Sequence, residues 1–202
     1  MKSRLPILLL LLLLPAAPAT RAATIFSGIL DLPIPLDFEG EYLRLDTGAT
    51  AATLPADWAT APWINPFFGG VDIGNSPLLR PVITGADQIL NLAPGTLIGS
   101  ASNFTAGESG SSTHFGLGLG QFAPNVPGYL GVAFRSTSAG PDYYGWMQIQ
   151  ISNTGPGKII SWAREDVSGA PIQAGAGVVP EPGTALLSLA GAGLALRRRR
   201  RA

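Results

Sequence analysis

The chain has 202 residues, with 26 glycines and 18 prolines, and only 13% of the residues are charged. This composition is typical of turns and short strands rather than long helices. Cysteine is absent and there is one histidine, which excludes disulfides and a zinc site of the usual ligand set. The length allows one domain once terminal segments are set aside.

The net charge of zero conceals an uneven distribution. Between residues 24 and 177, twelve acidic side chains stand against five basic ones. The other basic residues lie at the two ends of the chain, near the N-terminus and from Arg197 to Arg201. Phosphate contacts require Lys and Arg, so the acidic body is not expected to bind nucleic acid. The basic ends are suited to orienting segments at a membrane.

Residues 1–23 are typical of a signal peptide. Lys2 and Arg4 precede an apolar run over 5–14, and small residues follow it. Cleavage is expected after Ala19 or Ala22. A permanent N-terminal anchor is the alternative, but the apolar run is short for a membrane span.

Residues 24–177 form the predicted exported body. Several segments alternate between apolar and polar residues with the period of a β-strand, and glycine- and proline-rich turns separate them. The segments over 129–136 and 145–152 are expected to pair as a hairpin, and the glycine- and serine-rich region 100–120 to form a loop. We therefore predict an all-β fold with little helix, an antiparallel β-sandwich or jelly-roll-like body. The predicted strands lie at 25–30, 41–45, 129–134, 147–151 and 158–162.

The sharpest candidate for chemistry is the triplet Asp46-Thr47-Gly48, which follows a short apolar segment. It resembles the aspartic protease signature, whose chemistry requires two carboxylates that share a proton. A chain with one such triplet would need a dimer to provide the second carboxylate. The same triplet is also an ordinary turn, with Asp46 bonding to its own backbone and Gly48 at positive φ. We favour the turn and assign no catalytic residue.

Two weaker candidates involve Asp37, Glu39 and Glu41, and His114. The three acidic residues alternate, so they could share one face of a strand and hold calcium, although a solvated acidic face is the simpler interpretation. A Ser-His-Asp triad through His114 lacks a Gly-x-Ser-x-Gly motif, and a loop position is favoured. We therefore expect neither a metal site nor a cofactor.

Aromatic residues gather in two stretches of the body. Exposed, they could stack on sugar rings; buried, they would form the core of a domain without disulfides, which is the interpretation we favour. They are Trp58, Trp63, Phe67 and Phe68 in the first stretch and Tyr143, Tyr144 and Trp146 in the second.

The C-terminal stretch, residues 178–202, has three parts in a fixed order. Pro180-Glu181-Pro182 comes first, an uncharged segment over 183–196 follows, and the run of arginines ends it. As a helix at ~1.5 Å per residue, the uncharged segment covers about 21 Å, which is short for a bilayer core. The arginines are expected to hold its end on the cytoplasmic side. The apolar anchor is carried by Thr184, Leu186, Leu187, Leu189, Leu194 and Leu196.

This tail resembles the PEP-CTERM sorting signal of Gram-negative bacteria, and Pro180, Glu181 and Pro182 match its motif position by position. The resemblance implies processing by an exosortase, a membrane enzyme, and transient retention in the inner membrane with the body in the periplasm. The expected destination is the cell surface or extracellular matrix, with exopolysaccharide as a possible partner. The cytoplasmic stop is formed by Arg197, Arg198, Arg199, Arg200 and Arg201.

The body also resembles a recurrent domain of PEP-CTERM proteins through the order of three motifs, at 128–134, 143–151 and 159–175. The resemblance implies an all-β exported module and no catalytic residue. The sequence thus favours a non-enzymatic surface protein. A carbohydrate-binding module is the alternative, and a secreted hydrolase with Asp46 or His114 is the weakest.

Overall fold

The computed structural model describes residues 22–84, 88–105 and 121–177. Residues 1–21 of the predicted signal peptide, His114 and the tail with its sorting motif lie outside the described residues. In the described part, the regular elements are antiparallel β-strands and two 3₁₀ turns. The prediction of an all-β antiparallel body with little helix is therefore confirmed. None of the described residues belongs to a helix of the length and hydropathy needed to cross a bilayer.

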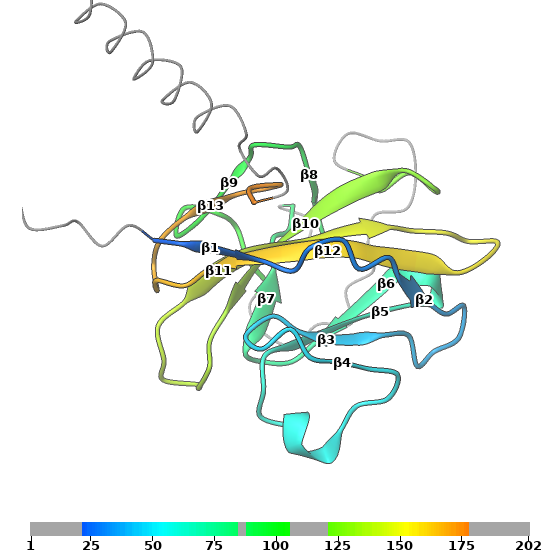
Figure 1. The fold of residues 1–202 in the computed structure, drawn as a ribbon, viewed down its shortest axis with the longest axis horizontal. Coiled ribbons are helices and arrows are strands. Elements are labelled where there is room, and N and C mark those ends of the chain that lie inside the picture. Colours follow the sequence, from blue (N-terminus) through cyan, green and yellow to red (C-terminus); the bar gives the residue numbers. More distant parts are fainter. Residues whose placement is uncertain (1–21, 85–87, 106–120, 178–202) are drawn as a thin grey trace, which may run out of the picture.

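Three long strands form the centre of the largest sheet (Figure 1). They are β10 (Pro127–Phe134), β11 (Tyr143–Gln150) and β12 (Gly157–Glu165). β10 and β11 form the predicted hairpin, with Phe134 opposite Tyr143 at the connecting loop. Short strands complete the edges: β1 (Thr24–Phe26) and β2 (Leu32–Ile34) pair with β12, and β7 (Leu79–Pro81) and β8 (Asn91–Leu92) pair with β10.

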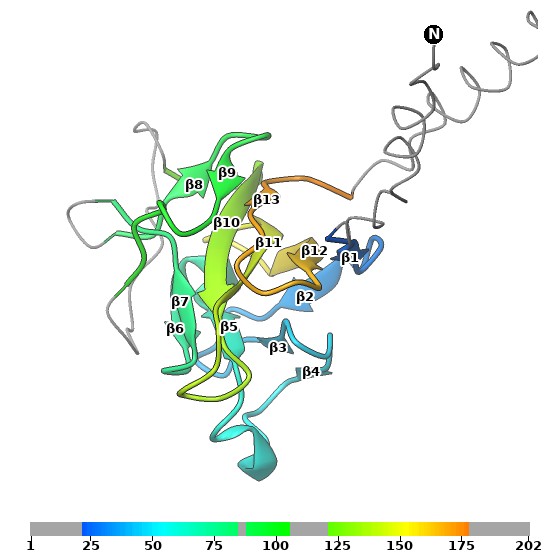
Figure 2. The same ribbon diagram turned by 90° about the vertical axis from the view of Figure 1, so that its left-hand side faces the viewer.

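Two smaller sheets lie on opposite sides of the long strands (Figures 1 and 2). The four-stranded sheet contains β3 (Tyr42–Arg44), β4 (Thr50–Ala51), β5 (Trp63–Phe67) and β6 (Asp72–Asn75). The two-stranded sheet contains β9 (Leu97–Ile98) and β13 (Ile172–Gln173). The 3₁₀ turns are η1 (Ala56–Trp58) and η2 (Phe68–Gly70).

The long strands are buried on both faces, because successive side chains of a strand point to opposite sides. The neighbours Trp146 and Met147 are both fully buried, yet they belong to different apolar clusters. Met147 packs in the larger cluster with Leu43 of the four-stranded sheet. Trp146 packs in the smaller cluster with Ile172 of β13. The result is a sandwich-like body with a further small sheet on its outer face.

The turn η2 crosses the start of β12 at very short range. Gly69 has a φ of 69°, and its carbonyl oxygen accepts a hydrogen bond of 2.9 Å from the amide of Ser152. A Cβ atom placed on Gly157 would overlap that same carbonyl oxygen. The crossing therefore requires glycine at position 157 for steric reasons alone.

Replacement Gly157→Ala should destabilise the protein by about 2–3 kcal/mol, because the backbone must shift to remove the overlap. Gly155→Ala is the matched control on the same turn, since a Cβ there first meets Ser152 Oγ at 4.0 Å. Urea unfolding of the two variants measures the difference. Equal stability of both variants would contradict the close crossing.

Candidate functional site

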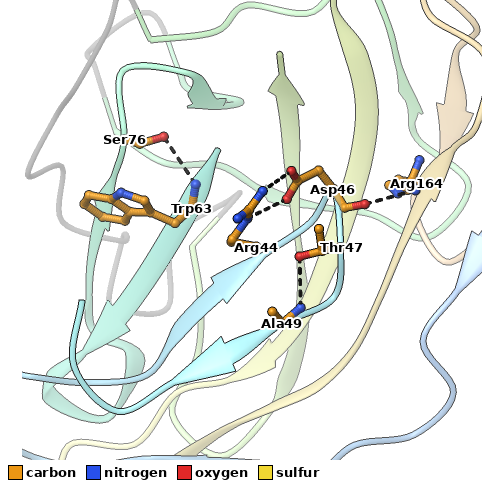
Figure 3. A network of polar contacts seen from close by, with 7 residues as sticks. All are labelled: Arg44, Asp46, Thr47, Ala49, Trp63, Ser76 and Arg164. Carbon is orange, nitrogen blue, oxygen red and sulfur yellow. Dashed lines mark hydrogen bonds and ion pairs between the residues drawn. The ribbon is translucent and has the colours of Figure 1, made fainter. Parts of the chain in front are cut away.

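The Asp46 segment forms the turn between β3 and β4 (Figure 3). The amide of Gly48 donates to the carbonyl of Arg44 at 2.7 Å, and Gly48 has a φ of 76°. The turn interpretation of the triplet is thus confirmed in its backbone. One detail differs: Thr47 Oγ1, and not the Asp46 side chain, accepts the local backbone bond, from the amide of Ala49 at 3.3 Å.

Both carboxylate oxygens of Asp46 accept hydrogen bonds from one guanidinium group. Arg44 donates to them from Nε at 3.0 Å and from Nη2 at 2.5 Å (Figure 3). The hydrogen bonds with Asp46 raise the pKa of Arg44, and its guanidinium carbon also lies 5.6 Å from the ring centroid of Trp58. Such a bidentate pair engages both carboxylate oxygens of Asp46 within the chain. The protease arrangement instead requires a second carboxylate that shares a proton.

The alternation of Asp37, Glu39 and Glu41 does not produce an acidic strand face, so this prediction is wrong. Asp37 and Glu39 lie in an irregular bend between β2 and β3, where Asp37 Oδ1 accepts from the amide of Gly40 at 3.1 Å. Glu41 is buried beside β3, and burial raises its pKa. No group of three His, Cys, Asp or Glu side chains within the described ranges is placed to hold a metal ion.

The aromatic residues divide between the core and the surface. Trp146, Tyr144 and Trp58 are buried, and Trp63 is half-buried. Phe67 and Phe68 instead form an exposed aromatic cluster with Phe38, whose side chain is 71% exposed. Ring centroids in this cluster are 5.1–6.0 Å apart. Phe68 has a φ of 50°, which is unusual for a bulky residue and places its ring at the surface.

Two cavities lie beside the β10–β11 loop, and the larger one also reaches the residues that follow η1. They have volumes of about 430 and 150 Å³, and Ser136 lines both. We call them together the loop-end groove. The larger cavity is lined by Ala59, Thr60, Pro77, Leu78, Ser136, Thr137 and Ser138, and the smaller by Asp46, Phe134, Ser136, Tyr143, Arg164 and Asp166.

Arg164 connects the smaller cavity to the Asp46 turn. Its Nη2 donates to the main-chain carbonyl of Asp46 at 3.1 Å (Figure 3). Its Nε is buried and has no hydrogen-bond acceptor among the described residues. Buried donors are normally paired with protein or with water. Arg164, which lines the smaller cavity, therefore has a hydrogen-bond donor at Nε that is unused among the described residues.

Asp142 clamps the two ends of the loop that forms the groove. Its Oδ1 accepts from Arg135 Nε at 2.6 Å and from Arg80 Nη2 at 2.8 Å, and its Oδ2 accepts from Arg135 Nη2 at 3.3 Å. Burial alone would raise the pKa of Asp142, but hydrogen bonds from Arg135 and Arg80 outweigh it and lower the pKa. The two ends of the loop are therefore held together on one carboxylate.

A search of family models, of curated proteins and of solved structures finds no match to this chain. The case for a site therefore rests on the geometry described above. Of the sequence candidates within the described residues, Asp46 and Tyr143 line the groove. Sequence reasoning missed Arg80, Arg135 and Asp142, because neither spacing nor a motif indicates that they meet.

Replacement Asp142→Asn should cost about 1 kcal/mol of stability at pH 7, the scale of charge-assisted bonds that remain partly exposed. The pKa of Asp142 is lower in the folded state, so its contribution is present above the ordinary value of 3.8 and is lost as pH falls further. Urea unfolding should show the two proteins converging near pH 2. A difference that stays constant with pH would contradict the clamp.

Proposed function

We propose that this chain is an exported cell-surface protein that acts by binding and is sorted through its C-terminal tail. The sorting part rests on the fixed order of Pro180-Glu181-Pro182, a short apolar segment and five arginines at the C-terminus. Each part has a physical role: an extended motif outside the bilayer, a marginal anchor and a cytoplasmic stop. An exosortase-type membrane enzyme is the proposed processing partner.

A binding role, rather than hydrolysis, is supported by the state of Asp46. Its carboxylate is engaged by Arg44 within the same chain, and the side chains of the two residues are only 16% and 21% exposed. A nucleophile or proton-sharing acid requires a carboxylate whose oxygens are free to reach a substrate or a water. In this protein the triplet instead supports one wall of the loop-end groove.

The loop-end groove favours a neutral carbohydrate as the ligand. The hydroxyl-bearing residues Thr60, Ser136, Thr137 and Ser138 line it together with apolar Pro77 and Leu78. Hydroxyl groups can exchange hydrogen bonds with a sugar, and apolar side chains can pack against its C–H groups. The larger cavity lies within the ~300–1,000 Å³ range of small-ligand sites.

The charges beside the groove also favour a neutral ligand. Asp46 is paired with Arg44, and the remaining charged lining residues, Arg164 and Asp166, have opposite signs. A site for a strongly charged ligand would instead carry an excess of one sign. An extracellular polysaccharide is therefore the proposed binding partner of the body.

The sorting proposal predicts the effect of replacing Pro180, Glu181 and Pro182 together with alanine. Export should be unchanged, but the full-length form should accumulate in the inner membrane because the motif for the processing enzyme is lost. Cell fractionation with an epitope tag in the body measures this. As a control, alanines at Val178 and Val179 should sort normally. Surface delivery of the triple variant as efficient as the parent's would show that the tail is only an anchor.

The binding proposal predicts that the full chain, purified in detergent, retains neutral glucose, galactose or mannose oligosaccharides on an array in preference to their uronic acid counterparts. Ser136→Trp should reduce binding at least tenfold, because the exposed side chain at this position would fill the groove. Thr154→Trp is the matched control, on the exposed β11–β12 turn at the other end of the hairpin.

Three results would contradict the groove as the site. One is the absence of glycan binding by the parent, and another is a preference for uronic acids. The third is a loss of binding in Phe38→Ser but not in Ser136→Trp, which would transfer the site to the exposed aromatic cluster.

A further inference from the structure

Among the described residues, the main-chain hydrogen bonds begin at Ala23. Its amide donates to Asp166 Oδ1 at 2.7 Å, and its carbonyl accepts from the amide of Asp166 at 3.1 Å. These two bonds extend the β1–β12 pairing, in which Thr24 lies opposite Glu165. Ala22 is exposed and makes no hydrogen bond with the described residues. Asp166 thus forms hydrogen bonds with both the amide and the carbonyl of Ala23.

This arrangement distinguishes the two possible ends of the signal peptide. Cleavage after Ala19 leaves three residues ahead of Ala23, including the cation Arg21. Cleavage after Ala22 makes the nitrogen that already faces Asp166 the N-terminus itself. Both sites have Ala at the first position before the cut, whereas the third position is Ala17 in one and Thr20 in the other. The choice of Ala22 therefore rests on the contacts of Ala23 and not on the local sequence.

We propose that the signal peptide is removed between Ala22 and Ala23 and that the new α-ammonium group of Ala23 forms an ion pair with the carboxylate of Asp166. This inference rests on the proposed export of the chain. Hydrolysis of the peptide bond consumes one water, leaves a carboxylate on Ala22 and leaves an ammonium group on Ala23. The nitrogen then carries a positive charge, so its hydrogen bond to the Asp166 carboxylate joins two ionised groups.

The new charge also affects the loop-end groove. Asp166 lines the smaller cavity together with Asp46, Arg164 and Tyr143, and Arg44 pairs with Asp46 from β3. Glu165 on β12 accepts from Thr24 Oγ1 at 2.8 Å. The ammonium group would pair with Asp166, the lining carboxylate that has no cationic partner among the described side chains.

Mass-spectrometric sequencing of the N-terminus of the exported protein tests the cleavage site. The expected first residues are Ala23-Thr24-Ile25. An exported protein that begins at Thr20 would overturn this inference and leave the export proposal intact. A chain that keeps residue 1 and stays in the membrane would overturn both.

Thermal unfolding of the exported protein tests the ion pair. Asp166→Asn keeps an acceptor for the Ala23 nitrogen but removes the charge, so the melting temperature should fall by about 2 °C at pH 6. An α-amino group titrates near pH 8 and Lys near 10.4. A pair that depends on a protonated amine loses its contribution as pH rises, so the difference should disappear by about pH 9.5.

Asp31→Asn is the matched control, because Asp31 makes a partly exposed ion pair of 3.0 Å with Lys158. The effect of this variant should persist at about pH 9.5, where lysine remains mostly protonated. If Asp166→Asn has the same effect at both pH values, or none at pH 6, the ammonium pair is absent and the proposal is wrong.

Discussion

Burial of the three long strands on both faces is the constraint on which the rest of this protein depends. A chain without cysteine has no disulfide cross-links, so its stability must come from packing. Alternate residues of β11 supply two apolar clusters at once, as Trp146 and Met147 illustrate. The four-stranded sheet covers one face and the β9–β13 pair covers part of the other, and neither small sheet has a buried apolar face without the long strands.

Arginine–carboxylate pairs fix the loops that the clusters do not reach. Arg44 orders the β3–β4 turn through Asp46, and Asp142 draws Arg80 and Arg135 onto one carboxylate. A planar guanidinium forms two directed bonds, which makes it suited to this role. Asp46 lines the loop-end groove, and Asp142 joins the two ends of the loop that carries Ser136. The pairs that order the loops therefore also support the proposed binding site.

Local patterns predicted the fold better than the site. The hairpin of β10 and β11 and the Gly48 turn follow from alternation and turn chemistry within a few residues. The prediction of an acidic strand face was wrong because Gly40, at a φ of 62°, bends the chain before β3. A side chain at position 40 would overlap the carbonyl oxygen of Pro66. The Arg80–Asp142 contact joins residues 62 positions apart, and only the folded topology brings them together. The exposed aromatic cluster was missed for the same reason, since Phe38 is remote in sequence from Phe67 and Phe68.

The fold also places the two ends of the body side by side. A Cβ atom on Gly177 would lie 3.3 Å from Thr24 Cγ2 and 3.2 Å from Phe26 Cβ, so the chain leaves the body against β1. The precursor is proposed to carry an apolar segment at each end, one before Ala23 and one after Pro182. Because both attachment points lie at the same edge, the body can fold while both segments remain in one membrane, and neither has to cross the sheets. On the proposed export route, the first segment can then be removed without disturbing the second. The tail can remain in the membrane until it is processed in turn.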